Sequence, residues 1–239
     1  MRSLNGYSTN FEKQIEALQM AYHDALCKIP PQAWSWGGGT ALAIYHLQHR
    51  ISFDIDIFVS DPQYFAFLSP KWFIEDTKNF HYDYQELAHH IRLSTRSGIK
   101  TDFLLAPYLI SMPSKNDLLE TGFDFYVDTI EEIIAKKLRY RFGEVRSRDI
   151  FDIAAALQKH GNMLKNIIKS TVITLDQVAE WKTALENMNM EKYKQDMEKM
   201  SPSENMTDLM LNTKDIILDA VGKLKPEILQ GGLAENLRH

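Results

Sequence analysis

The sequence predicts an α/β fold, of the α+β kind, in which a small mixed sheet is followed by a C-terminal helical bundle. Short runs in which apolar and polar residues alternate, the pattern of half-buried strands, occupy residues 34–36, 52–59, 90–96 and 99–105. From Thr129 onward, apolar residues instead recur with the period of about 3.6 residues that is typical of helices. We therefore expect two domains, residues 1–128 and residues 129–239.

An amphipathic helix and a short strand precede a glycine turn. Residues 11–29 predict the helix, which ends at Pro30-Pro31 because proline cannot continue it. The strand at 34–36 then runs into Gly37-Gly38-Gly39-Thr40. Because glycine has no Cβ, the backbone here can approach a phosphate closely, and the apolar stretch that follows predicts a helix starting at Thr40. Thr40 is expected either to cap this helix or to donate its hydroxyl to a ligand.

Two carboxylates lie two residues apart on the next predicted strand. Alternation projects Asp54 and Asp56 to one face and points Phe53, Ile55 and Ile57 the other way, into the core. Adjacent carboxylates repel each other and resist desolvation, so the pair predicts a hard cation such as Mg²⁺, held by oxygen ligands. The same strand is therefore expected to serve both the core and the chemistry.

The glycine turn and the acidic pair each have an ordinary structural alternative, a turn into a helix and an acidic strand end. Their spacing favours a site, because Gly39 precedes Asp54 by fifteen residues, which is room for one short helix between them. Magnesium commonly keeps coordination positions for the phosphates of a substrate. Together the two segments predict a metal and phosphate site.

This combination resembles the nucleotidyltransferase superfamily. More narrowly, it is similar to the AbiEii/AbiGii toxin family of nucleotidyltransferases, on the segments Gly38-Gly39-Thr40-Ala41-Leu42 and His49-Arg50-Ile51-Ser52-Phe53-Asp54-Ile55-Asp56-Ile57-Phe58. Two later segments fit the same family, Ile134-Ala135-Lys136-Lys137-Leu138 and Arg148-Asp149-Ile150-Phe151-Asp152-Ile153. The resemblance implies that residues 1–128 form a nucleotidyltransferase-like catalytic domain with an NTP as substrate.

The resemblance also implies a third carboxylate on a later strand, for which Asp102 is the candidate. The strand at 99–105 is expected to pair with residues 90–96 in a hairpin that turns at Ser97-Gly98. Taken alone, the residue pattern favours Asp102 as an ordinary exposed strand residue. Within the resemblance, Asp54, Asp56 and Asp102 are the expected ligands of one or two Mg²⁺ ions. Asp102 either only ligates metal or also takes the proton of the acceptor.

Two cations fall inside the apolar stripe of the first predicted helix of the second domain. A capping box at 129–132 starts this helix, which is expected to continue to about Phe142. At roughly 100° per residue, Lys137 and Arg141 lie within the stripe and Lys136 lies outside it. A buried cation needs a partner, unless it snorkels to the edge of the core. The resemblance implies that Lys137 contacts the triphosphate.

One of two aspartates in the next helix is implied to belong to the site. The residues alone leave both open, since Asp149 suits the first turn of a helix and Asp152 could pair with Arg148 four residues earlier. Arg50 and Ser52 precede the acidic pair, where a guanidinium can bind phosphate through two hydrogen bonds. The predicted nucleotide-binding residues are Gly38, Gly39, Thr40, Arg50, Ser52, Lys137, Arg141, Asp149 and Asp152.

The charge of the whole chain does not indicate a nucleic-acid-binding protein. Lysine and arginine number 27 against 32 aspartates and glutamates, for a formal net charge of −5. Between Ala135 and Ser170, however, the sequence has nine basic and three acidic residues, a local net charge of +6. Such a segment suits a triphosphate or an RNA backbone, although a solvated helix face has the same composition.

The remaining sequence predicts a cytoplasmic protein without a membrane span. Cys27 is the single cysteine, which excludes an internal disulfide. No apolar run approaches the roughly 20 residues that cross a bilayer, and the first residues lack the apolar core of a signal peptide. Further helices are predicted at 162–172, 175–188, 191–200 and 206–224.

The family resemblance implies transfer of a nucleoside monophosphate from an NTP to an acceptor hydroxyl, with release of pyrophosphate. It implies the toxin of a toxin–antitoxin or phage-abortive system, with a tRNA acceptor and a cognate antitoxin protein as partners. The alternatives are an enzyme that modifies a small molecule such as an antibiotic, and a non-catalytic nucleotide-binding module on the same scaffold. The four residues expected to act in catalysis are Asp54, Asp56, Asp102 and Lys137.

Overall fold

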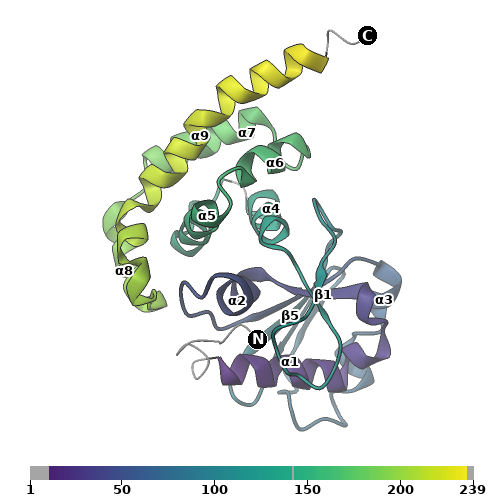
Figure 1. Ribbon diagram of the computed structural model, residues 1–239. Coiled ribbons are helices and arrows are strands. Elements are labelled where there is room, and N and C mark those ends of the chain that lie inside the picture. Colours follow the sequence, from purple (N-terminus) through teal and green to yellow (C-terminus); the bar gives the residue numbers. More distant parts are fainter. Residues whose placement is uncertain (1–10, 142, 236–239) are drawn as a thin grey trace. The chain divides into compact units, whose positions relative to one another are not determined.

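The computed structural model describes residues 11–141 and 143–235, with side chains described as far as Leu224 (Figure 1). The chain divides into two compact units, Met1–Ile133 and Ile134–His239. The predicted domain boundary between residues 128 and 129 stays a prediction. Phe142, near which the sequence places the end of a helix, lies outside the described residues, as does the N-terminal segment considered for a signal peptide.

Seven strands of the first unit form one mixed sheet in the order β3-β4-β5-β2-β1-β7-β6. The strands are β1 (Trp34–Gly37), β2 (Ile55–Val59), β3 (Gln85–Leu87), β4 (His90–Ser94), β5 (Lys100–Leu105), β6 (Ser114–Lys115) and β7 (Tyr126–Val127). Strand β2 is antiparallel to β1 and parallel to β5, and β4 with β5 forms the predicted antiparallel hairpin. The predicted α/β class with a mixed sheet is confirmed. The sequence misses β3, β6 and β7, because two or three residues are too few to show alternation.

Helices from the N-terminal half of the first unit pack against this sheet. Helix α1 (Glu12–Asp24) packs against β2 and β5, and α2 (Gly38–Ala41) lies beside β1 and β2 and continues as the π-helix η4 (Leu42–Leu47) (Figure 1). A short helix α3 (Pro62–Ala66) contacts β2. These helices and the sheet enclose buried apolar side chains such as Leu18, Leu42 and Ile57.

Of the three side chains predicted to point from the strand at 52–59 into the core, two are buried. Ile55 and Ile57 are fully buried, but Phe53 is 57% exposed, so its predicted place in the core is wrong. Strand β2 begins only at Ile55, and the alternating directions of a strand do not extend to a residue that precedes it. Trp36 of the neighbouring β1 and Phe103 of β5 fill the core beside Ile57 in the strand register.

Helix α4 (Ile130–Tyr140) begins in the first unit at the segment where the capping box is predicted. The Thr129 hydroxyl accepts a hydrogen bond from the Glu132 backbone N–H at 3.2 Å. The buried Glu132 carboxylate accepts hydrogen bonds from three consecutive backbone N–H groups, of residues 109–111, at 2.8 to 3.2 Å. The Glu132 side chain thus anchors a loop of the first unit.

The second unit is helical, as predicted. Its elements after α4 are α5 (Ser147–Lys159), α6 (Met163–Lys169), α7 (Leu175–Glu186), α8 (Met190–Met200), the 3₁₀ turn η6 (Glu204–Met206) and α9 (Thr207–Glu235). Helix α9 lies along α5, α6 and α7 (Figure 1). Among the described residues, no helix combines the length and apolar character that crossing a membrane would require.

Candidate nucleotidyl-transfer site

The glycine turn brings the backbone directly against two charged side chains. Gly38 has φ +67°, in the left-handed region that favours glycine, and a Cβ there would lie 1.9 Å from Oδ2 of Asp56. A Cβ on Gly39 would lie 2.8 Å from Nη2 of Arg50, which is itself only 3% exposed. Any side chain at Gly38 would therefore displace the Asp56 carboxylate. The turn and the acidic strand form one structure, as their spacing indicates.

Two buried hydroxyls fasten the segment before β2 to helix α2. The Thr40 hydroxyl hydrogen bonds with the Ser52 hydroxyl at 2.8 Å and with the backbone carbonyl of Asp54. Gln14 of α1 donates to the Ser52 carbonyl at 2.8 Å. Helix α2 begins at Gly38, so the predicted start at Thr40, and Thr40 as its cap, are wrong. The positive φ at Gly38 lets the chain turn into the helix two residues earlier than a capping threonine would.

The strand register places the second and third predicted carboxylates side by side. Strands β2 and β5 are parallel neighbours in which Asp56 is the partner of Asp102, so both side chains project from the same face of the sheet. Asp54 lies one residue before β2. Asp54 and Asp56 are half-buried, and Asp102 is 5% exposed. We call these three residues the acidic cluster.

The hairpin supplies two residues that the sequence analysis missed. Arg92 is the register partner of Asp102, and its Nε and Nη2 donate to the two Asp102 oxygens at 2.6 and 2.8 Å. His90 Nε2 lies 2.9 Å from Asp102 Oδ1. The hydrogen bonds to Asp102 raise the pKa of Arg92, and the charges of Asp102, Asp54 and Asp56 add to this effect. Arg92 thus lies within electrostatic reach of the whole acidic cluster.

A signal for Arg92 was present in the sequence. His90 and Arg92 are two residues apart on a predicted strand, so they share a face. The turn at Ser97-Gly98 sets the hairpin register, and that register places Arg92 opposite Asp102. A register count across the predicted hairpin would have found the ion pair.

The acidic cluster offers the hard carboxylate oxygens that Mg²⁺ prefers, and Asp54 and Asp56 fit such an ion. Asp102 accepts hydrogen bonds from Arg92 and His90 on both of its oxygens, two on Oδ1 and one on Oδ2, so these residues compete with an ion for its lone pairs. In keeping with this, the described residues contain no group of three or more Asp, Glu, His or Cys side chains arranged to hold a metal. Arg92 offsets part of the negative charge that a divalent ion would neutralise.

The predicted residues of the second unit form a separate buried ion cluster between α4 and α5. Lys137 Nζ lies 2.5 Å from Asp149 Oδ1 and 3.0 Å from Asp152 Oδ2, and Arg141 Nη1 lies 3.2 Å from Asp149 Oδ2. The side chains of Lys137, Asp149 and Asp152 are 7%, 6% and 0% exposed. We call these four residues the helical ion cluster. Both aspartates between which the sequence could not choose contact Lys137.

The charges of the helical ion cluster balance one another. Burial raises the pKa of Asp149, but the nearby Lys137 and Arg141 more than offset this, so its pKa lies below the ordinary value. A cavity of only about 10 Å³ adjoins Lys137, Arg141 and Asp149, which is room for a single water. The arrangement satisfies buried charges in the way that a stable core requires.

The structure also corrects the predicted position of Lys136 on its helix. The helical wheel places it outside the apolar stripe, yet it is only 4% exposed. Every residue from Glu132 to Leu138 is buried, so this part of α4 is enclosed on more than one side. A wheel that assumes a single buried face cannot anticipate such a helix.

A mixed sheet that sets paired carboxylates beside a glycine turn, followed by a helical unit, defines the chain as a nucleotidyltransferase. The family model described as "Nucleotidyl transferase AbiEii toxin, Type IV TA system" matches residues 31–216. The chain therefore belongs to the AbiEii family of nucleotidyltransferase toxins of type IV toxin–antitoxin systems. The resemblance found in the sequence is confirmed.

Solved structures resemble this chain at low sequence identity. JHP933 from Helicobacter pylori is 18% identical, with a TM-score of 0.50 over 98% of this chain and 100% of the other. A nucleotidyltransferase structure from H. pylori has 20% identity and a TM-score of 0.47 over 93% and 98% of the two chains. MenT4, a nucleotidyltransferase toxin from Mycobacterium tuberculosis, has 16% identity and a TM-score of 0.45 over 63% and 59%. No curated protein matches the sequence significantly.

Proposed function

We propose that the chain transfers a nucleoside monophosphate from an NTP to a hydroxyl of an RNA acceptor, of the tRNA class, and releases pyrophosphate. The observation that carries this proposal is the register pairing of Asp56 with Asp102, next to a turn in which Gly38 leaves no room for a side chain. We place the activity in the cytoplasm, where NTP and tRNA are found together. A cognate antitoxin is the partner that a type IV toxin implies.

Within the acidic cluster, Asp54 and Asp56 would hold Mg²⁺, and Asp102 would join them as the third ligand. The ion would supply electrostatic stabilisation of the charge that develops on the transferred phosphate and on the leaving pyrophosphate. Thr40 and Ser52 support this set indirectly, because their hydroxyls fix the backbone at Asp54. Asp102 lies on the face from which it could also take the acceptor proton.

The phosphate tail of the NTP would lie on the glycine turn. Gly38 and Gly39 present backbone without side chains, and the buried guanidinium of Arg50 lies directly beside Gly39. Oriented backbone N–H groups and a guanidinium are the donors that bind phosphates in proteins. This part of the proposal assigns phosphate binding to the turn and to Arg50.

The helical ion cluster enters the proposal through the family resemblance. An ammonium group has three N–H donors, and Asp149 and Asp152 accept two of those of Lys137. We assign the third to an NTP phosphate, with Arg141, one residue beyond the end of α4, as a second cation. In this proposal the two aspartates orient Lys137 and do not themselves contact the nucleotide.

The test is label transfer by purified protein. Wild type is incubated with each NTP labelled at the α-phosphate, with Mg²⁺ and total RNA, and compared with Asp56→Asn. We expect label in a tRNA-sized band with wild type only. The matched control is Asp83→Asn, which removes the same charge from an exposed position of the first unit and should transfer at the wild-type rate.

Three outcomes would contradict the proposal. Equal transfer by Asp56→Asn would refute the assigned site. Label found only on a small molecule in a cell extract would favour the antibiotic-modifying alternative. NTP binding without pyrophosphate release for any acceptor would favour a non-catalytic module.

A further inference from the structure

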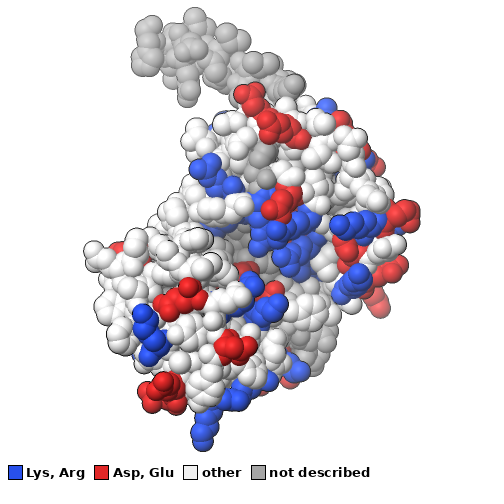
Figure 2. All heavy atoms as spheres, turned by 180° about the vertical axis from the view of Figure 1, so that it is seen from behind, with Lys and Arg blue, Asp and Glu red and all other residues white. Residues whose placement is uncertain are grey.

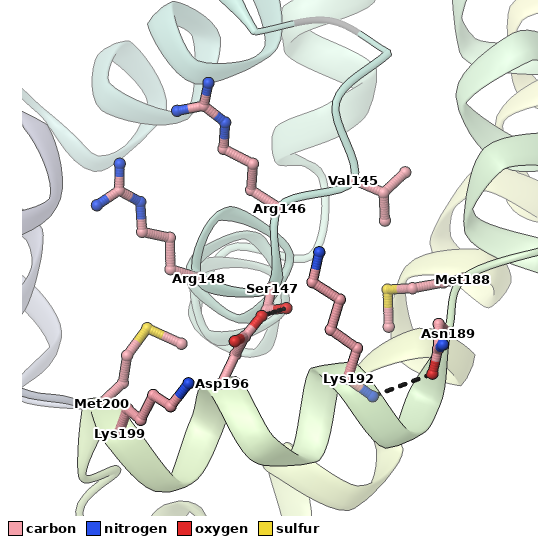
Figure 3. Close-up of a pocket in the computed structure, with 10 residues that line it drawn as sticks. All are labelled: Val145, Arg146, Ser147, Arg148, Met188, Asn189, Lys192, Asp196, Lys199 and Met200. Carbon is pink, nitrogen blue, oxygen red and sulfur yellow. Dashed lines mark hydrogen bonds between the residues drawn. The ribbon is translucent and has the colours of Figure 1, made fainter.

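A pocket of about 470 Å³ lies within the helical unit, and the proposed reaction uses none of its residues. One wall comes from the N-terminal end of α5 and the segment before it, and the other comes from α8, as Figure 3 shows. Helices α5 and α8 contact each other within this unit. The pocket is lined by Val145, Arg146, Ser147, Arg148, Met188, Asn189, Lys192, Asp196, Lys199 and Met200.

The lining is strongly basic. Arg146 and Arg148 come from one wall, and Lys192 and Lys199 come from the other. We call the pocket that they line the basic pocket. Against these four positive charges the lining has a single acid, Asp196, so its net charge is 4 − 1 = +3. Lys and Arg side chains also gather on the face of the molecule that Figure 2 shows. Charge of one sign around a concave surface raises the local concentration of oppositely charged ligands.

The acids near the basic pocket already have partners. Asp196 accepts a hydrogen bond from the Ser147 hydroxyl at 2.7 Å, and Glu144 pairs with Arg146 Nε. Among the described residues, no acid forms an ion pair with Arg148, Lys192 or Lys199. These three exposed cations therefore do not hold the fold together, and they are available to a ligand.

The arrangement of the side chains matches phosphate groups. Arg146 and Arg148 extend in the same direction from the start of α5, and Lys192 and Lys199 extend from α8 on the facing wall (Figure 3). A guanidinium binds a phosphate through two parallel hydrogen bonds, whereas an ammonium acts as a point charge. Cations on both walls of an open pocket suit a ligand with several successive phosphates.

The basic pocket also has apolar surface. The side chains of Met188 and Met200 line it and are half-buried, and Val145 is similarly placed. Thioethers are polarizable groups that pack well against aromatic rings, which a nucleobase resembles in size and flatness. A chain of carboxylates, as in an acidic protein segment, would use the cations but not this surface.

From these observations we infer that the basic pocket binds the phosphodiester backbone of a single RNA strand, with a base against Met188 or Met200. This inference rests on the proposed function, because the strand would belong to the acceptor RNA. It assigns to the helical unit a site for acceptor recognition that contains none of the residues proposed for the chemistry. The double variant Arg148→Ala/Lys192→Ala removes one cation from each wall.

The test is fluorescence anisotropy of the full chain with a labelled single-stranded RNA oligonucleotide, without NTP and with EDTA present. We expect the double variant to bind at least tenfold more weakly than wild type. The slope of log affinity against log salt concentration should fall by about 1.4, since each phosphate contact to a single strand contributes about 0.7. The exchanged variant Arg148→Lys/Lys192→Arg, which keeps both charges, should recover most of the affinity.

The matched control is Lys182→Ala/Lys223→Ala. It removes two lysines of the same unit that already pair with Glu186 and Asp219, so the net charge falls equally. We expect less than a twofold change in RNA affinity. An equal loss in both double variants would overturn the inference, because binding would then follow net charge alone.

Other ligands give different results in the same assay. Loss of affinity for free ATP in Arg148→Ala/Lys192→Ala, with RNA binding unchanged, would make this a triphosphate site and overturn the inference. Displacement of RNA by poly-glutamate at equal charge concentration would indicate a protein partner and overturn it too. RNA binding is measured without NTP, so it stands even if no transfer is found. Label transfer to RNA with undiminished binding by the variant would refute the pocket and leave the proposed function intact.

Discussion

The acidic cluster and the helical ion cluster use the same residue types in opposite ways. The acidic cluster combines three carboxylates with Arg92 and His90, and two of its carboxylates, Asp54 and Asp56, are half-exposed. The helical ion cluster sets two carboxylates against two cations, and its lysine and both aspartates are buried. Among the members named here, the acidic cluster has more carboxylates than cations and lies partly near solvent, whereas the helical ion cluster has equal numbers of each and is largely buried.

The difference separates a residue's contribution to activity from its contribution to stability. Surplus charge of one sign opposes folding through repulsion, so it persists where a ligand completes the set. A balanced buried set is costly to disrupt, because removing one member leaves another charge buried without compensation. We therefore expect substitutions in the acidic cluster to affect chemistry, and substitutions in the helical ion cluster to affect stability first.

The largest expected effect is on activity, for Asp56→Asn. Loss of one cation ligand should lower the rate of nucleotidyl transfer by about 10³-fold or more. The free energy of unfolding in urea should stay within about 1 kcal/mol of wild type, because the change also removes repulsion from neighbouring carboxylates. A variant that lost both activity and several kcal/mol of stability would break the comparison, since Asp56 would then be a structural residue.

The largest expected effect on stability is for Lys137→Met. It leaves Asp149 and Asp152 buried without the ammonium, which should cost about 3–5 kcal/mol in urea unfolding. The matched control Lys182→Met removes a surface pair with Glu186 and should cost less than about 1 kcal/mol. If Lys137→Met instead unfolded like wild type, the buried ion pairs with Asp149 and Asp152 would contribute nothing to stability, and the comparison would fail.

The sequence was sufficient to predict the main strands and the glycine turn, but not where each element begins. Alternation at 90–96 and 99–105 was sufficient to predict the β4–β5 hairpin, and glycine spacing was sufficient to associate the turn with Asp56. The boundaries failed where side-chain alternation is a poor guide, at exposed Phe53 and at the earlier start of α2. Alternation does not show at which residue strand pairing begins, and the positive φ of Gly38, which starts α2 early, cannot be read from the sequence.

The sequence did not predict which charged side chains pair with one another. Arg92 faces Asp102 only through the hairpin register, and Lys137 meets both aspartates only because α4 packs on α5. The basic pocket was not visible at all, because Lys192 and Lys199 follow Arg148 by more than forty residues and reach it through the packing of α8. A single sequence shows which residues carry charge, whereas tertiary packing decides whether that charge is neutralised.

A smaller effect should follow from Arg92→Gln. The substitution removes a cation that neutralises Asp102, so affinity for Mn²⁺, a probe for Mg²⁺, should rise roughly tenfold in isothermal titration calorimetry. Arg96→Gln, on the same hairpin and hydrogen-bonded to the Lys78 carbonyl, is the control and should leave Mn²⁺ affinity unchanged. Weaker Mn²⁺ binding by Arg92→Gln would show that the ion pair is needed to hold Asp102 in place.

The smallest effect is the pH dependence contributed by Asp149. Its pKa in the folded protein is depressed, so its contribution to stability is present above the unfolded pKa, near 4, and is lost as the pH falls through the lower folded pKa. Urea midpoints of wild type should therefore decline below about pH 4. Asp149→Asn should be less stable at pH 7 and decline less steeply. Parallel pH profiles of the two proteins would show that the ion pair with Lys137 contributes no such linkage.

The most direct test of the functional assignment is Mn²⁺ binding by the acidic cluster in the presence of a non-hydrolysable NTP analogue, followed by electron paramagnetic resonance. Wild type should bind the ion, and Asp56→Asn and Asp102→Asn should each bind at least tenfold more weakly, while the exposed control Asp83→Asn binds as wild type does. Unchanged Mn²⁺ affinity in both acidic-cluster variants would contradict the account.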